Sequence, residues 1–549
     1  MRNARIARLT KLYHTAKVLR PEQILYRIYY RFAKIKPYAA TPVSKNLSFD
    51  LANPPRWNSS RITEDGQFDF MGSKAAIEWH NESLPKIWQY NLHYLDHLTA
   101  RQEHDSSLSE TDLVNSWITA NPPFAGCGWE PYTLSLRIVN LVKWLQMQPH
   151  LDQRWLESLA VQTHALSQRI EYHILANHLF VNGKALVFAG SFLQTGEAGN
   201  WLKTGLKILD REVKEQFLTD GAHFELSPMY HASLLWDMCD LLNLALNAKI
   251  DALKSRAPEW RRVIEQGIIW LRSMQHPDGE IPFFNDCAFG IAPALRDIEG
   301  YAALLGCQPP ADAADTSSIG AICHAESGFA HIAFGEGSKA LLNFAQVAPV
   351  YQPGHTHADT LSFELSVFGQ RVFVNSGTSQ YGEDSERHRQ RSTAAHNTVE
   401  IDGENSSEVW AGFRVARRAR VSLSTFESTG ESVRIVCSHD GYQRLKGKNL
   451  HTREWNATRN TLQINDSVTG AFDKSIARFH LHPEASVTQN DNGLTITLAS
   501  GETVSVSISG AACISIANTT WHPEFGKSVA NQCIVVELSS DTLITRVTW

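Results

Sequence analysis

The sequence lacks several features that would directly identify a functional class of protein. None of its eight cysteines stands in a CxxC spacing, which argues against a zinc knuckle or a disulfide framework and favours reduced thiols. No apolar run reaches the roughly 18 residues of a membrane-spanning helix. The net charge is only −6 over 549 residues, so we expect no nucleic-acid partner.

The first 36 residues also lack the apolar core and cleavage site of a signal peptide. We therefore expect a cytoplasmic protein or one peripheral to the inner membrane, with the periplasm as the alternative. This stretch has ten Lys or Arg and one acid, Glu22, and its apolar residues recur near helical spacing. Such helices either dock onto the main body or contact an anionic membrane surface, and the sequence leaves both readings open. It gives no oligomeric state.

The remaining chain changes its pattern twice. Residues 1–75 are the basic helical N-terminal segment, and residues 76–305 repeat apolar residues at helical spacing, as in a solenoid or an α/α toroid. Residues 306–320 are small, polar and proline-containing, which is typical of a linker. Residues 321–549 alternate with period two between turn residues, which predicts an antiparallel β-sandwich. The predicted fold class is a multidomain α+β protein.

Histidines gather in two neighbouring stretches of the strand-rich part. PGHTHADT contains His355 and His357, VNSGT contains Asn375, and AHNTV contains His396. Histidine is suited to proton transfer near neutral pH, and its neutral imidazole is a common metal ligand. One loop histidine is more often structural, but a group of this kind indicates a site.

The helical part carries polar side chains within apolar helices. An unpaired buried amide costs roughly 1–3 kcal/mol, so each of these groups must bond within the core or face a ligand. They are Asn91 and Tyr94 in QYNLHY, Arg137 in WEPYTLSLR, Asn177 and His178 in ANHLFVNGKAL, and Glu225, Tyr230 and His231 in HFELSPMYH.

These motifs, in this order, resemble the heparinase II/III-type polysaccharide lyases and related alginate lyases. NHLFVNGKAL, SPMYH, GHTHAD and RSTAAHNTV carry the resemblance, which covers about residues 80–480. It implies an incomplete α/α toroid on an antiparallel β-sandwich, with the active cleft between them. It also implies β-elimination across the C4–O bond of a uronic acid residue in an anionic polysaccharide, leaving an unsaturated end. A role in bacterial surface or capsular polysaccharide metabolism would suit the absence of a secretion signal.

The resemblance assigns roles to matching positions. Asn177, helped by His178, corresponds to the amide that offsets the uronate carboxylate. Tyr230 corresponds to the tyrosine that gives a proton to O4, and it can take the C5 proton of the opposite epimer; His355 corresponds to the histidine base. We further expect substrate contacts from Asn91, Tyr94, Arg137, Glu225, His231 and Arg391.

A structural zinc ion is the cofactor that the resemblance implies. His357 and His396 match two of three zinc ligands in the metal-bearing members, but the third ligand is an aspartate there and Asn375 here. An amide oxygen is a poorer zinc ligand than a carboxylate. The predicted zinc site therefore consists of His357, Asn375 and His396, and the amide in place of a carboxylate lowers its expected affinity for the ion.

Two other functions fit parts of the pattern. HTHAD resembles the HxHxD of binuclear metal hydrolases, although Thr360 and a predicted strand follow it here. A catalytically silent glycan-binding or assembly protein on the same scaffold is the other alternative. Basic residues between Arg387 and Arg420 predict a wall for an anionic polymer, or else a solvated loop and a charged edge strand.

Overall fold

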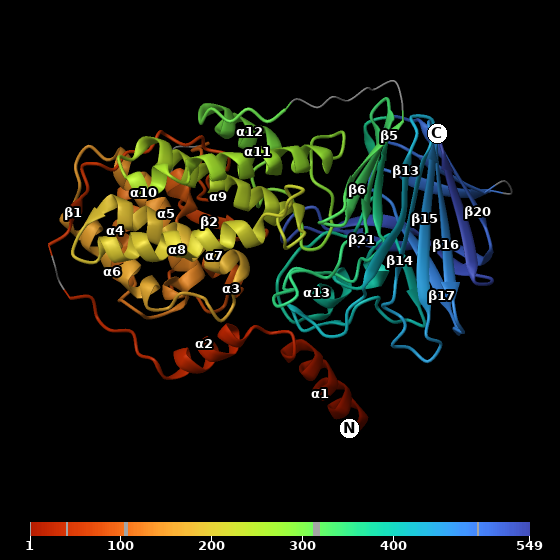
Figure 1. Cartoon of the computed structure of the whole chain (residues 1–549), viewed down its shortest axis with the longest axis horizontal. Helices are drawn as coiled ribbons and strands as arrows, with labels where there is room; N and C mark the ends of the chain where they lie inside the picture. The colour runs from red at the N-terminus through yellow and green to blue at the C-terminus, as the bar shows by residue number, and fades with distance from the viewer. Residues whose placement is uncertain (1, 40–41, 104–107, 311–318, 491–492) are drawn as a thin grey trace.

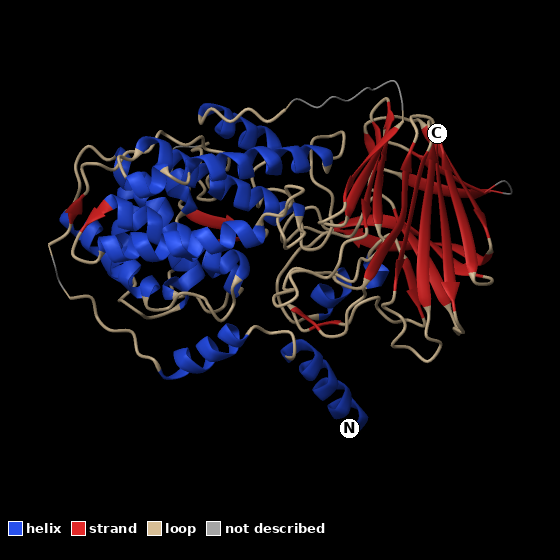
Figure 2. Ribbon diagram, viewed as in Figure 1, coloured by secondary structure: helices blue, strands red, loops and turns tan. Residues whose placement is uncertain are grey.

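The computed structural model describes the chain except for residues 1, 40–41, 104–107, 311–318 and 491–492. A helical part and a strand-rich part lie side by side (Figure 1), and the two kinds of element hardly mix (Figure 2). The predicted α+β class is confirmed at this level. Much of the predicted linker, residues 311–318, lies outside the described residues.

The helices precede the long sheets in the chain, apart from one short helix. None of the described helices is both long and apolar enough to cross a bilayer. Their bounds are α1 Arg2–Ala16, α2 Pro21–Phe32, α3 Lys86–Tyr94, α4 Glu110–Ala120, α5 Pro131–Met147, α6 Gln153–Ser167, α7 Ala176–Phe192, α8 Ala198–Gln216, α9 Pro228–Asn247, α10 Asp251–Lys254, α11 Ala257–Ser273, α12 Leu295–Leu304 and α13 Ser385–Gln390.

Helix α7 is the centre of the helical part. Apart from His178, all of its residues are buried, as expected for a helix that is apolar on every side. Its neighbour α8 approaches closely because both helices carry glycine at the contact. A Cβ atom on Gly205 would lie 2.6 Å from the Gly183 carbonyl oxygen, so the contact excludes side chains there. This packing fixes α7, whose first turn carries Asn177 and His178.

The strands form antiparallel sheets. Four short strands belong to small pairs beside the helices: β1 Ser44–Lys45, β2 Gln67–Phe70, β3 Ser73–Ala76 and β4 Leu193–Gln194. The others are β5 Gly320–His324, β6 Phe329–Gly335, β7 Ser338–Asn343, β8 Phe363–Val367, β9 Gln370–Phe373, β10 Val399–Ile401, β11 Val409–Trp410, β12 Arg414–Val415, β13 Val421–Ser428, β14 Val433–His439, β15 Leu450–Thr458, β16 Thr461–Thr469, β17 Ser475–His480, β18 Ser486–Asn490, β19 Gly493–Thr497, β20 Thr503–Ser509, β21 Ala511–Trp521, β22 Val529–Leu538 and β23 Thr542–Thr548.

Three of these sheets share one hydrophobic core. Their strand orders are β5-β6-β7-β8-β9, β10-β17-β22-β21 and β13-β14-β15-β16-β23-β20-β19-β18. Strands β15 and β16 alternate strictly between buried and half-buried residues, as period two requires of a sheet with one covered face. Leu365, Ile534 and Trp455, one from each sheet, belong to the same cluster of buried side chains.

A buried ionic network fastens the histidine-bearing loops to the largest sheet. Arg453 on β15 donates to both carboxylate oxygens of Asp466 on β16, at 2.8 and 3.0 Å, and to the carbonyls of Leu361 and Asn397. Burial opposes the charge of Asp466, but Arg453 and a hydrogen bond from His451 lower its pKa from 3.8 to about 2. The loops after residues 357 and 396 thus depend on this pair.

We expect Asp466→Asn to lower the free energy of unfolding by about 3 kcal/mol at pH 7, because it leaves Arg453 buried without its counter-charge. A carboxyl group with a lowered pKa stabilises the fold above its unfolded pKa, and that stabilisation is lost as the pH falls through the folded value. The difference in free energy of unfolding between Asp466→Asn and the wild type should therefore become smaller between about pH 4 and pH 2. Urea denaturation at a series of pH values measures this, with exposed Asp541→Asn as the control. A difference that stays constant over this range would contradict the role of the ion pair.

Candidate active site

A cavity of about 1170 Å³ lies between the helical and strand-rich parts. Side chains of α3, α5, α7 and α9 line it from one side, and the loops around residues 351–355 and 411–418 line it from the other. Of the predicted site residues, it brings together Asn91, Tyr94, Asn177, His178, Tyr230 and His355.

His355 is held in one orientation by Asp286. Its Nδ1 lies 3.0 Å from Asp286 Oδ2, so the bond assigns the ring proton to Nδ1 and leaves Nε2 as an acceptor. Burial opposes the charge of Asp286, but the guanidinium of Arg387, bonded to both carboxylate oxygens, holds its pKa well below the usual range. A permanently ionised carboxylate thus prepares the His355 Nε2 atom to take a proton.

Tyr230 lies directly against this imidazole. The two rings stack with centroids 3.8 Å apart, and the Tyr230 hydroxyl is 3.0 Å from that of Tyr381. Burial, together with the nearby Tyr381, raises the pKa of Tyr230 well above its ordinary value. The phenol therefore stays protonated and can donate, so an acid and a base face the cavity side by side.

Asn177 begins α7 and is almost fully buried. Its backbone N–H and its Nδ2 donate to the two oxygens of Glu225, at 3.1 and 3.0 Å. Nδ2 is also 3.3 Å from His355 Nε2 and donates its second hydrogen to that atom, so the amide lies directly beside the base. The carboxylate of Glu225 lies behind Asn177 and positions the amide, which differs from its predicted role as a substrate contact.

His178 is the half-buried cationic group of the site. Burial lowers its pKa, but the Glu171 carboxylate, 3.0 Å from Nδ1, prevails and raises it above the ordinary value. Its ring packs on Tyr132 with centroids 4.4 Å apart. The shift favours the imidazolium form beside Asn177, which is suited to donate to an anion.

Strained backbone accompanies these groups. Leu175 and Ala176, just before Asn177, have φ angles of 70° and 55°, and Asn285, just before Asp286, has 60°. Leu226, just after Glu225, has 57°. Each such conformation costs on the order of 1–3 kcal/mol in a non-glycine residue, and such residues cluster at functional sites. The strain falls beside the residues that orient the acid and base.

Three predicted substrate contacts are wrong, because each side chain is fully buried and bonded within the protein. Arg137 donates to Gln162 and to the carbonyls of His93 and Gly128, and it stacks on Trp117. His231 accepts from the His223 N–H at Nδ1 and donates from Nε2 to the Gly267 carbonyl. Arg391 donates to four backbone carbonyls, those of Thr356, Ala411, Gly412 and Arg414.

One of the three residues predicted to hold zinc does not fit the ion. His357 Nε2 donates to Asp286 Oδ1 and His396 Nδ1 donates to the Ser392 carbonyl, so the unprotonated His357 Nδ1 and His396 Nε2 atoms face each other at 3.1 Å. The Asn375 oxygen accepts from the Asn397 N–H, while its nitrogen, a donor, is buried without a partner. Among the described residues, no group of three His, Cys, Asp or Glu side chains could hold a metal.

The sequence prediction missed Asp286, Tyr381 and Glu171, and it placed Arg387 in a basic wall for the polymer, whereas that side chain is fully buried against Asp286. Asp286 comes from the turn between α11 and α12, and its partner Arg387 lies 101 positions later in α13. Tyr381 and Glu171 likewise lie on loops. The one available signal was a charged residue in the otherwise apolar run FFNDCAF.

Two models of known protein families match most of the chain. A model described as heparinase II/III N-terminus matches residues 65–305, and one described as heparinase II/III-like, C-terminal, matches residues 323–549. A heparin-sulfate lyase of Bacteroides stercoris is 24% identical over 446 residues, covering 77% of this chain and 62% of that protein. One of Pedobacter heparinus is 27% identical over 305 residues, covering 50% and 44%. The alignments thus span less than two thirds of these relatives' own length.

Solved structures show the same fold. A crystal structure of heparinase III superposes with a TM-score of 0.68 at 18% identity and covers 89% of this chain and 80% of its own. That of a heparan sulfate lyase from Pedobacter heparinus gives 0.55 at 18% identity, with 88% and 80% covered. The two family models together cover most of the chain and show that it belongs to the heparinase II/III-like family.

Proposed function

We propose that this protein is a polysaccharide lyase that cleaves a uronic-acid-containing polymer by β-elimination. The observation that carries the proposal is the stacked pair of Tyr230 and His355 on the cavity wall, with ring centroids 3.8 Å apart. Asn177 and His178 beside it are donors for an anionic group. At the level of architecture, we propose that the helices form an incomplete α/α toroid and the sheets a β-sandwich.

The elimination divides among these residues as follows. His355 Nε2 takes the C5 proton, and the electrons of that C–H bond form the C4–C5 double bond. The C4–O4 bond breaks, and the Tyr230 hydroxyl protonates the leaving O4. Charge that develops on the uronate carboxylate during proton removal is offset by the Asn177 amide and the His178 imidazolium. The sequence-based expectation that Tyr230 also takes the C5 proton of the opposite epimer would need the phenolate, which the raised pKa of the Tyr230 hydroxyl disfavours.

The alternative functions have less support. A binuclear hydrolase would need His355, His357 and Asp359 to converge, but Asp359 is buried and accepts from the Asn285 N–H, and the two imidazoles bind Asp286. A silent glycan-binding scaffold would not need the hydrogen-bond partners, Asp286 and Tyr381, that hold His355 and Tyr230 in place.

The proposal is tested by incubating the protein with heparan sulfate, hyaluronan, alginate and bacterial capsular polymers. We expect a rise in the ultraviolet absorbance of unsaturated uronate with at least one of them. Tyr230→Phe should lower kcat by roughly a hundred- to ten-thousand-fold with an unchanged fold, because only the proton donor is lost. The matched control Tyr381→Phe should lower kcat by no more than about tenfold, which corresponds to the loss of one hydrogen bond. New reducing ends without the absorbance would instead indicate a hydrolase.

Zinc is left out of this mechanism, since the oxygen of Asn375, the third predicted ligand, already accepts from the Asn397 N–H. We expect the purified protein to hold far less than one zinc ion per chain by elemental analysis. Asn375→Asp restores a carboxylate beside the two imidazoles and should raise the zinc content toward one. A stoichiometric zinc ion in the wild type that is lost in His396→Ala would show that the ion binds there after all.

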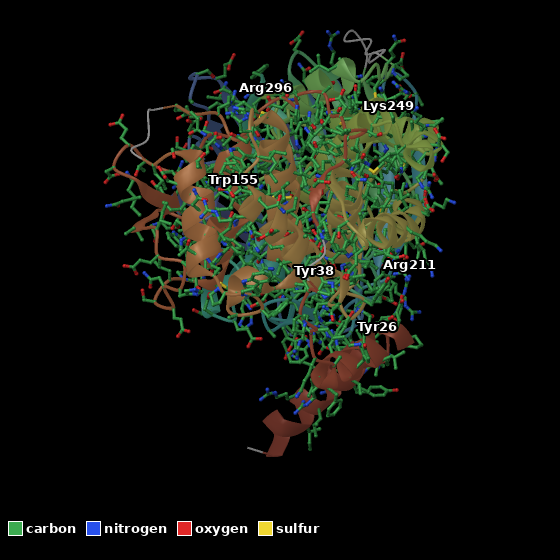
Figure 3. All side chains as sticks on the ribbon, turned by 90° about the vertical axis from the view of Figure 1, so that its left-hand side faces the viewer. Tyr26, Tyr38, Trp155, Arg211, Lys249 and Arg296 are labelled. Atoms are coloured by element: carbon green, nitrogen blue, oxygen red, sulfur yellow. The ribbon has the colours of Figure 1, made fainter. Side chains whose placement is uncertain are left out.

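We further propose that α1 and α2 contact an anionic membrane surface. They carry nine exposed large apolar side chains, among them Tyr13 at 66% and Phe32 at 76% exposed, and basic residues outnumber the single acid. Figure 3 shows these helices extending beyond the body of the molecule, with Tyr26 marking α2. An apolar face with a basic rim is typical of helices that lie in a membrane interface.

This contact is measured by sedimentation with phosphatidylglycerol vesicles against phosphatidylcholine vesicles. The protein should prefer the anionic vesicles, and Leu25→Ser with Phe32→Ser should weaken binding by roughly tenfold or more, because two apolar side chains no longer enter the lipid. Leu304→Ser, at a position 72% exposed on α12, is the control. Equal binding by the double variant and the wild type would overturn the membrane contact.

A further inference from the structure

The N-terminal helices form part of the cavity wall. Leu12, Thr15 and Leu19 from α1 and the turn after it, and Arg27 from α2, line the cavity that holds Tyr230 and His355. These residues precede position 65, where the match to the family begins. The chain therefore completes its cavity with a segment that lies outside the matched domains.

This segment is anchored on both sides of the cavity. On the helical side, the buried Gln23 donates to the Ile174 carbonyl at 3.2 Å, and the Tyr30 hydroxyl donates to the Ile170 carbonyl at 2.6 Å. On the strand side, the Trp410 indole donates to Thr15 Oγ1 at 3.1 Å. In Figure 1, α1 and α2 accordingly pass beneath the junction of the two parts.

Three arginines line the strand-side and N-terminal walls of the cavity. Arg27 on α2, Arg414 on β12 and Arg418 after it all line the wall. None of them forms an ion pair with any acid of the described residues, whereas the nearby Arg20 and Arg417 pair with Glu215 and Glu408. The three positive charges are thus left uncompensated.

Arg418 has hydrogen-bond donors that lack an acceptor. The Arg418 Nη1 atom donates to the Val350 carbonyl at 2.6 Å, but its Nε and Nη2 are buried without a partner. Burial lowers the pKa of Arg418 to about 10, and partial burial together with the positive charge of Arg414 lowers the pKa of Arg27. The like charges of Arg27 and Arg414 repel each other, so a bound anion would relieve that repulsion and could accept from Arg418.

We propose that Arg27, Arg414 and Arg418 form an anion subsite that binds an acidic group of the polymer away from the cleaved bond. This inference rests on the proposed lyase function and deepens it. The ligand is a sugar carboxylate or a sulfate ester, because both match the planar donor fork of arginine. The N-terminal segment is then part of the substrate-binding surface.

The experiment measures binding rather than turnover, in the full-length Tyr230→Phe protein. Its probes are a hyaluronan oligosaccharide, which offers carboxylates alone, and a heparan sulfate oligosaccharide, which adds sulfates. Replacing Arg27, Arg414 and Arg418 together by Ala should weaken binding of the preferred probe by roughly tenfold or more and flatten its dependence on salt. Replacement of the same three residues by Lys should restore part of the affinity, since the charge returns without the fork.

The control is the double change Arg31→Ala with Arg420→Ala, which removes exposed cations from the same helix and the same loop without touching the cavity lining. It should leave affinity unchanged. If the triple Ala variant binds both probes as tightly as its parent, the subsite is wrong while the lyase proposal stands. If the Tyr230→Phe parent binds neither probe, nor alginate and capsular oligosaccharides, both proposals fall together. Preference for one probe identifies the acidic group.

Discussion

The candidate site depends on one buried carboxylate. Asp286 is fully buried, yet it stays ionised because Arg387 contacts both of its oxygens, and it accepts in turn from His355 and His357. A buried charge of this kind is costly without its partner, so the pair forms only when α13 closes over the turn that carries Asp286. The tautomer of His355, and with it the chemistry on the cavity wall, therefore follows from a contact between the two parts of the molecule.

The same constraint explains where backbone strain collects. Asn285 must adopt a left-handed conformation to bring Asp286 under both imidazoles, and Leu175 and Ala176 must do so to start α7 with Asn177 aimed at Glu225. The close packing of α7 on α8 through Gly183 and Gly205 supplies a rigid support against which this strain can be held. The strained backbone thus lowers the stability of the fold, but it keeps the hydrogen-bond donors and acceptors of the site aligned.

The sequence predicts most of the architecture and the reacting groups, but not the groups that position them. Asn177, Tyr230 and His355 stand in motifs and reach the cavity. Arg137 and Arg391 looked like substrate contacts because a sequence cannot distinguish an arginine bonded to backbone carbonyls from one facing a ligand. Asp286 was missed because its role depends on Arg387, 101 positions away, and long-range pairing leaves no local pattern. Asn375, read from the sequence as a weak zinc ligand, instead accepts a backbone hydrogen bond.

Charge is distributed unevenly along the cavity, so its two ends attract an anionic polymer to different degrees. In the helical part, Lys143 and Lys184 share Asp240, and Lys184 also binds Asp237, so the fixed charges there cancel. Where α2 meets β12, the charges of the three arginines do not cancel. An anionic polymer is drawn more strongly toward the arginine end, because unpaired charges act over a Debye length of about 8 Å at physiological salt whereas paired charges largely cancel. The proposed anion subsite would thus hold an acidic group of the polymer in the same cavity as Tyr230 and His355.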